Sequence, residues 1–133
     1  MSAAGAGQSY AAAVSGVAMG AMPSGTVTFL FTDIEGSTRL WQEDEASMRQ
    51  AVARHDQLLG AVIGDYGGVV FSTMGDGLAA AFQTASAAVS CALEAQSLIH
   101  RESWEMVRPI KVRIGLHTGE AEFRGGDYFG TAV

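Results

Sequence analysis

Residues 26–38, TVTFLFTDIEGST, predict how the chain begins to fold and where its chemistry lies. Large apolar residues alternate over the first half of this segment, which is typical of a β-strand with one strongly apolar face. Asp33 follows in the same alternation, where a carboxylate needs a neutralising partner. Gly36, Ser37 and Thr38 then begin a helix, and free N–H groups at a helix start attract anions. A carboxylate beside an anion site suits a metal-bound polyphosphate.

A second acidic feature lies further along the chain. Residues 69–74, VVFSTM, and 78–82, LAAAF, predict two strands, and the GDG between them predicts a tight hairpin turn with Asp76 at its tip. If this hairpin pairs beside the first strand, Asp33 and Asp76 can share one or two divalent cations. Each feature also has an ordinary structural explanation, because Asp-Gly is a common turn and Ser or Asp often caps a helix. The two features together favour a metal site.

The motifs FTDIEGST and STMGDG, followed by the strand-like segment IKVRIGLHTGE, resemble the catalytic domain of the class III nucleotidyl cyclases, which make cyclic AMP or cyclic GMP. The resemblance implies a partial catalytic domain over residues 24–133 and takes in every predicted element. Residues 1–23 are uncharged and rich in Ala, Gly and Ser, so a disordered or linker-like tail is expected there.

Helical periodicity is clearest in two segments. Residues 46–66 predict a helix after a shorter one at 38–41. Thr84 predicts the cap of another helix, which runs to about His100. The side chains expected on the apolar side of the first helix are Met48, Val52, His55, Leu59, Val62, Ile63 and Tyr66, and those of the second are Val89, Leu93, Gln96 and Ile99.

The strands complete a recognisable order. Residues 110–117 alternate most regularly, and residues 121–124 are expected to form one further strand. The resulting prediction is an α+β fold with a ferredoxin-like βαββαβ core, in which helices cover one face of an antiparallel sheet. The class III cyclase fold implied by the resemblance adds a C-terminal helix and strands to this core, and the sequence is expected to lack them.

The resemblance implies two-metal chemistry at the first two motifs. Asp33 and Asp76 would be the catalytic carboxylates and would hold two Mg²⁺ or Mn²⁺ ions, with the backbone carbonyl of Ile34 as a further ligand. In the family, the ribose 3′-hydroxyl attacks the α-phosphorus of the nucleotide and pyrophosphate leaves. The protein's contribution would be positioning and charge neutralisation.

The resemblance also implies how the phosphates are held. Gly36, Ser37 and Thr38 correspond to the phosphate-cradling loop of the family. A Phe is usual where Ser37 stands, and this departure is expected to affect packing more than phosphate contact. Arg113 matches an arginine that approaches the phosphates, although the alternation alone would leave it free to face solvent.

Recognition of the base is expected to involve Ser72 and Asp127. Adenylate cyclases usually pair a Lys with an Asp to read adenine; here Ser72 stands at the Lys position and Asp127, in GGDYFG, matches the Asp. The Glu and Cys typical of guanylate cyclases are both missing. ATP is therefore favoured over GTP.

Three functions are consistent with these residues. The first is an adenylate cyclase domain with impaired turnover, because the family's transition-state Asn and Arg would follow the final GTAV; losing one such group typically costs about 10²–10³ in rate. The second is a degenerate cyclase-like regulatory or dimerisation module of a bacterial signalling or transcriptional regulator. The third is a ferredoxin-like binding domain in which Asp33 and Asp76 are turn residues only. Family sites form between head-to-tail subunits, so a homodimer or a heterodimer with another cyclase domain is expected.

The composition of the chain argues against nucleic-acid and membrane partners. The 133 residues carry a formal net charge of −6 and only 8 Lys and Arg, without a basic cluster, so no nucleic-acid binding is expected. Cys91, the single cysteine, is interpreted as a core residue in a reducing, cytoplasmic compartment. His55 and His117 are interpreted as structural. Residues 1–23 lack the pattern of a signal peptide or a membrane span, so no membrane insertion is expected.

Overall fold

The computed structural model describes residues 22–106 and 108–130, so most of the expected tail and the final residues lie outside the described part. A single antiparallel sheet has the strand order β2-β3-β1-β4-β5, and its first four strands have the ferredoxin-like arrangement. The elements are β1 (Gly25–Ile34), α2 (Ser37–Glu43), α3 (Glu45–Asp65), β2 (Val69–Met74), β3 (Gly77–Phe82), α4 (Ala85–Arg101), β4 (Val112–Arg124) and β5 (Asp127–Phe129). The predicted fold class is confirmed.

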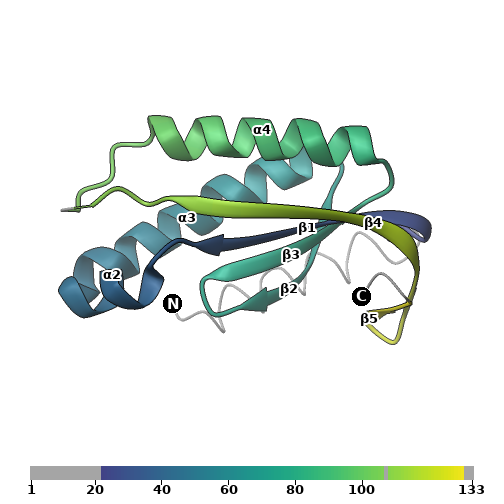
Figure 1. Cartoon of the computed structure of the whole chain (residues 1–133), viewed down its shortest axis with the longest axis horizontal. Helices are drawn as coiled ribbons and strands as arrows, with labels where there is room; N and C mark the ends of the chain where they lie inside the picture. The colour runs from purple at the N-terminus through teal and green to yellow at the C-terminus, as the bar shows by residue number, and fades with distance from the viewer. Residues whose placement is uncertain (1–21, 107, 131–133) are drawn as a thin grey trace.

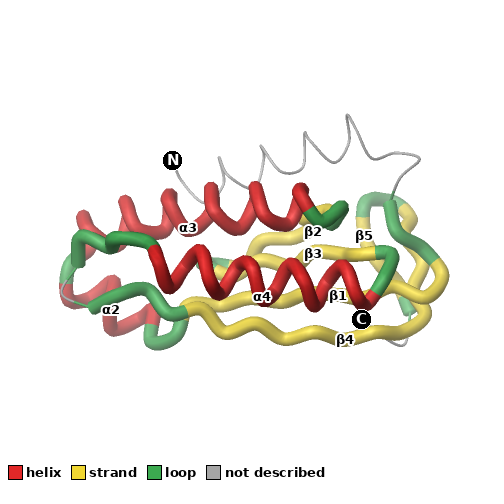
Figure 2. Tube along the Cα trace, turned by 90° about the horizontal axis from the view of Figure 1, so that it is seen from above, coloured by secondary structure: helices red, strands yellow, loops and turns green. Residues whose placement is uncertain are grey.

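The two long helices, α3 and α4, lie on the same side of the sheet (Figures 1 and 2). We call the covered side the helix face and the other side the open face. Side chains of the helix face and of the helices form the main core, which is mostly aliphatic and includes one phenylalanine of the sheet. The sheet residues of this core are Leu30, Ile34, Val70, Leu78, Ala80, Phe82 and Val112.

The central strand β1 is buried on both faces. Val27 and Phe29, which the alternation places on one apolar face, belong to the open face, whereas Leu30 and Ile34 lie under the helices. The apolar face predicted for β1 is therefore confirmed at Val27 and Phe29, and the strand buries residues on its other face as well.

A small aromatic cluster packs on the open face. The ring of Tyr128 meets those of Phe29, Phe71 and Phe123 edge-on, with centroids 5.1, 4.9 and 5.0 Å away. The Tyr128 hydroxyl donates to the carbonyl of Pro23 at 2.8 Å, and burial raises the pKa of this phenol to about 12. The cluster thereby ties the chain just before β1 to β5.

Helix α3 matches its prediction closely. Its N-cap Asp44 accepts a hydrogen bond from the backbone N–H of Ser47 at 3.1 Å, as a capping carboxylate does. The helix ends at Asp65, and its C-cap Tyr66, expected on the apolar side, is 37% exposed. The residues of α3 that are buried are Met48, Ala51, His55, Leu59, Val62 and Ile63.

Helix α4 begins as predicted but turns a different side to the sheet. The Thr84 hydroxyl accepts from the backbone N–H of Ala87 at 3.2 Å. Leu93 is 70% exposed and Val89 46% exposed, so the expected apolar side is wrong for these two residues. The buried residues are Ala88, Cys91, Ala95 and Ile99. Small side chains let the helix lie close to the sheet, which a pattern weighted by large apolar residues does not detect.

The last strands also differ from their predicted limits. Strand β4 is continuous from Val112 to Arg124 and begins after Ile110, so the separate strands expected at 110–117 and 121–124 are one element. Pairing along the whole of β1 keeps β4 extended through its glycines. Gly125 and Gly126, both with positive φ, then form the turn into β5.

Candidate active site

Asp33 lies at the end of β1 and is held by Arg113. The two residues are direct cross-strand partners, and the Arg113 Nε and Nη2 atoms donate to the two carboxylate oxygens of Asp33 at 2.7 Å each. This hydrogen-bonded pairing lowers the pKa of Asp33 and raises that of Arg113. About half of the Asp33 side chain stays exposed. The sequence did not predict this pair, although the neutralising partner that Asp33 required is Arg113.

The hairpin turn that carries Asp76 lies next to the same end of β1. Asp76 follows Gly75, whose φ of +59° suits a glycine, and the turn joins the paired ends of β2 and β3. A Cβ atom at Gly77 would lie 2.4 Å from the carbonyl oxygen of Thr32, so only glycine allows the strands this approach. Since Thr32 immediately precedes Asp33 in β1, the structure brings the turn with Asp76 beside Asp33.

The expected phosphate loop connects β1 to α2. Gly36 is the N-cap of α2 with a φ of +63°, and it has no side chain that could satisfy the N–H groups of the first turn, to which Ser37 and Thr38 belong. Leu40, the buried residue of α2, anchors the helix in the main core. The backbone N–H of Glu35 donates to the carbonyl of Lys111 at 2.8 Å and fixes the connection to the start of β4.

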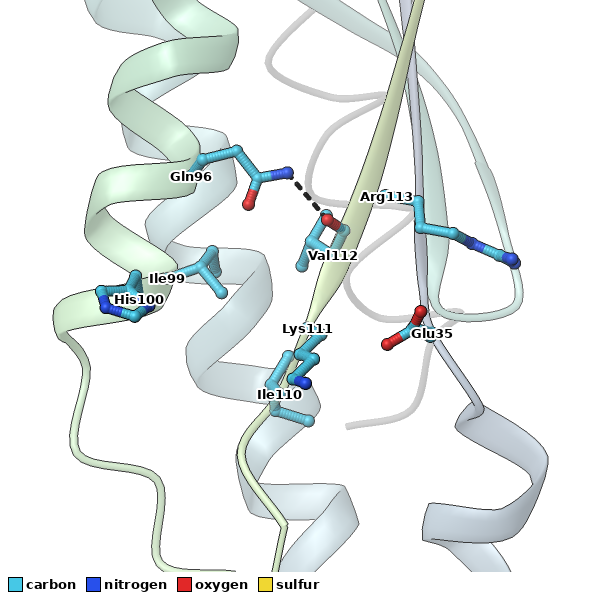
Figure 3. Close-up of a pocket in the computed structure, with 8 residues that line it drawn as sticks. All are labelled: Glu35, Gln96, Ile99, His100, Ile110, Lys111, Val112 and Arg113. Atoms are coloured by element: carbon cyan, nitrogen blue, oxygen red, sulfur yellow. Dashed lines mark hydrogen bonds between the residues drawn. The ribbon is translucent and has the colours of Figure 1, made fainter.

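A pocket of about 340 Å³ lies at the edge of β4 next to this region (Figure 3). Within it, the side-chain amide of Gln96 donates to the carbonyl of Val112 at 2.7 Å. Figure 3 shows Arg113 directed away from α4, to the side where Asp33 accepts its hydrogen bonds. The pocket therefore borders the Asp33 site without containing its carboxylate. Its lining residues are Glu35, Gln96, Ile99, His100, Ile110, Lys111, Val112 and Arg113.

Ser72 shares the open face with Asp33. It follows an irregularity in β2 and pairs with Ala79, which in turn pairs with Phe31 of β1. Directly opposite residues in a sheet point to the same face, and Phe31 and Asp33 are two positions apart on one strand. The structure thus groups Ser72 with the carboxylate, across two strands.

Asp127 lies at the other end of the sheet. It pairs with Arg124, which is eleven positions along β4 from Arg113. At about 3.3 Å per residue, this places Asp127 roughly 36 Å along the strand from Asp33. Its carboxylate accepts a hydrogen bond from the adjacent Tyr128 N–H at 2.8 Å. The structure does not bring Asp127 together with the other predicted site residues of the same chain.

The donor atoms at the end of β1 fit a hard divalent cation. Two carboxylates and a backbone carbonyl are oxygen ligands, which Mg²⁺ and Mn²⁺ prefer, and Mg²⁺ commonly uses one or two carboxylates together with phosphate oxygens. A cationic group, the guanidinium of Arg113, already binds both oxygens of Asp33. Within residues 22–106 and 108–130, no group of three Asp, Glu, His or Cys side chains could hold a metal ion by itself. Two carboxylates and one carbonyl would leave coordination positions that water or phosphate oxygens could take.

The fold and the pair of acidic motifs agree with a known family. Residues 19–124 match the family described as the adenylate and guanylate cyclase catalytic domain. An uncharacterised protein of Mycobacterium tuberculosis is 43% identical over 113 residues, which cover 84% of this chain and 37% of that protein. This chain belongs to the adenylate and guanylate cyclase catalytic domain family.

Solved structures show the same architecture. A Trypanosoma brucei adenylate cyclase in its monomeric state superposes with a TM-score of 0.75 at 28% identity, over 86% of this chain and 68% of that one. An adenylate/guanylate cyclase/hydrolase from Silicibacter pomeroyi gives 0.65 at 34% identity, over 80% and 63%. The chain spans only about a third of the mycobacterial relative.

Among the described residues, no helix is both long and apolar enough to cross a bilayer.

Proposed function

We propose that this chain carries the metal- and phosphate-binding half of a class III adenylate cyclase site, which converts ATP to cyclic AMP and pyrophosphate. The observation that carries the proposal is the convergence of Asp33, at the end of β1, with the hairpin turn of Asp76. The carboxylates of these two residues and the carbonyl of Ile34 would hold two Mg²⁺ or Mn²⁺ ions. Such ions, when bound, would offset the charge of the triphosphate and favour deprotonation of the ribose 3′-hydroxyl.

The residues around the carboxylates would orient the triphosphate. Gly36, Ser37 and Thr38 would present the first N–H groups of α2 to phosphate oxygens, since Gly36 leaves that turn without a side-chain cap. Arg113 would add a positive charge from the neighbouring strand, close to Asp33. The chain would thus contribute positioning and charge neutralisation, which dominate phosphoryl transfer.

The base would be read by residues from two chains. Ser72 lies on the open face with Asp33, whereas Asp127 lies at the far end of β4, so one copy would supply Asp127 to a site formed by another. We therefore propose head-to-tail association, either as a homodimer or as a heterodimer with another cyclase domain. ATP would be favoured over GTP only modestly, because replacing the usual Lys with Ser72 removes a polar contact worth about 1–3 kcal/mol.

The proposal is tested by giving the chain a partner that completes its site. The chain is mixed with a full-length class III cyclase whose own metal-binding Asp residues are replaced by Ala. Synthesis of cyclic AMP that requires both proteins, and that disappears when this chain carries Asp33→Ala, would support the proposal. Lack of synthesis despite a heterodimer seen by analytical ultracentrifugation would contradict it.

A regulatory or dimerisation module is the second candidate. It is favoured by the distance between Asp127 and Asp33, which prevents one copy from assembling a whole site by itself. Repeating the mixing experiment with an intact partner cyclase separates the two functions. A module that acts only by association would alter the activity of an intact partner cyclase equally with or without Asp33→Ala in this chain.

A further inference from the structure

The ion pair between Asp33 and Arg113 places a cationic side chain on the carboxylate that the proposed function assigns to metal. Both oxygens of Asp33 accept from Arg113, at 2.7 Å each, in the side-on geometry of a bidentate pair. The two residues face each other across β1 and β4, so the backbone ladder holds them in register. The pair is therefore built into the sheet and does not depend on a flexible loop.

We propose that Arg113 is a latch on Asp33: its guanidinium competes with a divalent cation for the carboxylate and moves to the phosphates when a metal-bound nucleotide arrives. This inference rests on the proposed function in one respect, namely that Asp33 is a metal ligand. Its new content is that Arg113 weakens the binding of free metal and strengthens the binding of metal with nucleotide. The site would then favour the metal–nucleotide complex over either metal or nucleotide alone.

The exposure of the pair makes such an exchange feasible. The Arg113 side chain is 66% exposed and that of Asp33 49% exposed, so water screens their attraction and breaking the pair costs little. A pair of this kind would weaken competing metal binding by about fivefold or less. A deeply buried pair would instead exclude the metal altogether.

A second carboxylate, that of Glu35, can stabilise the Arg113 guanidinium after it leaves Asp33. Glu35 contributes to the electrostatic stabilisation of charged Arg113, and both residues border the same pocket. Figure 3 shows Glu35 and Arg113 on the side of β4 away from α4. Arg113 can therefore leave Asp33 without leaving the site, which a latch that also contacts phosphate requires.

The test measures the affinity for Mn²⁺ alone by electron paramagnetic resonance of the free ion. Arg113→Gln removes the latch and one positive charge. Lys111→Gln is the matched control: it removes one positive charge two residues before Arg113, just ahead of β4, and keeps the backbone carbonyl that accepts from the Glu35 N–H. Arg113→Lys keeps the charge but loses the bidentate geometry.

The latch predicts that Arg113→Gln binds Mn²⁺ about three- to fivefold more tightly than the unaltered chain, with Arg113→Lys in between and Lys111→Gln nearly unchanged. The same Arg113→Gln variant should bind a non-hydrolysable ATP analogue with Mn²⁺ several-fold more weakly. Equal Mn²⁺ affinity in Arg113→Gln and the unaltered chain, or an equal gain in Lys111→Gln, would overturn the latch.

Failure of the proposed function would look different in the same assay. If Asp33→Asn leaves the binding of Mn²⁺ unchanged, Asp33 is not a metal ligand, and both the proposed site and the latch are wrong. If Asp33→Asn abolishes binding while Arg113→Gln gives no gain, the metal site stands and only the latch is wrong.

Discussion

The two faces of the sheet are built from the same strands but differ in what they carry. The helix face is sealed by α3 and α4 and contributes aliphatic residues, alanines and Phe82 to the main core. The open face carries an aromatic cluster, a partly exposed Phe31 and the polar side chains of Asp33, Ser72 and Arg113. Alternation along β1 therefore places neighbouring residues of one strand in a sealed core and on the face that carries the candidate site.

Substitution of one phenylalanine on each face should give the largest contrast. Phe82→Ala is expected to lower the free energy of unfolding by about 3–5 kcal/mol, because Phe82 is fully buried on the helix face and packs under the start of β2. Phe31→Ala should cost clearly less, since 36% of Phe31 is exposed. Urea denaturation of both variants measures the difference, and equal losses would show that the open face is as much a core as the helix face.

The orientation of α4 provides the next test. Ala88→Leu should destabilise the domain by about 1–3 kcal/mol through overpacking against the sheet. Leu93→Gln, on the opposite side of the helix, should change stability by no more than about 0.5 kcal/mol. Thermal unfolding of the two variants is the measurement. A large loss in Leu93→Gln together with a tolerated Ala88→Leu would restore the side of α4 predicted from the sequence.

Part of the fold could be predicted from the sequence, and the orientation of α4 could not. The βαββαβ order, the hairpin around Asp76, the helix that begins after Gly36 and the cap Thr84 all follow from local periodicity and turn chemistry, and the structure has each of them. The side of α4 could not be obtained in this way, because its buried residues are small and its large apolar ones are exposed.

The Asp33–Arg113 pair and the position of Asp127 could not be predicted from local sequence patterns either. The alternation of residues along the strand places Arg113 on one face of β4. Its pairing with Asp33 depends on the register of β4 against β1, which joins residues far apart in the chain. The separation of Asp127 from Asp33 has the same origin, since it depends on the length of β4. Periodicity describes one strand at a time, whereas these contacts are set by pairing.

A smaller effect is expected from the buried histidine of the helix-face core. His55 is fully buried; its Nδ1 lies 2.9 Å from an oxygen of Asp56, but its Nε2 has no hydrogen-bond partner among the described residues. His55→Leu should raise the free energy of unfolding by about 1 kcal/mol, because it removes a desolvated polar atom. Denaturation in urea would test this. A loss of stability would show that the Asp56 contact outweighs the buried nitrogen.

The smallest effect concerns the exposed ion pair of the open face. Arg113 lowers the pKa of Asp33 below its value in the unfolded chain, so the pair stabilises the fold above about pH 4 and this contribution is lost as the pH falls through the lower folded value. Because Asp33 is half exposed, the contribution should stay under about 1 kcal/mol. Asp33→Asn should flatten the pH dependence of stability below about pH 4, and an unchanged profile would contradict the role of the pair.

The most direct test of the central claim is calorimetric binding of a non-hydrolysable ATP analogue in the presence of Mn²⁺. We expect binding by the unaltered chain and a loss of at least about tenfold, equivalent to about 1.4 kcal/mol, in both Asp33→Ala and Asp76→Ala. Glu94→Gln, which removes an exposed carboxylate from α4, is the control and should bind normally. Equal affinity in all four proteins would show that the carboxylates at the end of β1 and in the hairpin turn do not form the metal–nucleotide site.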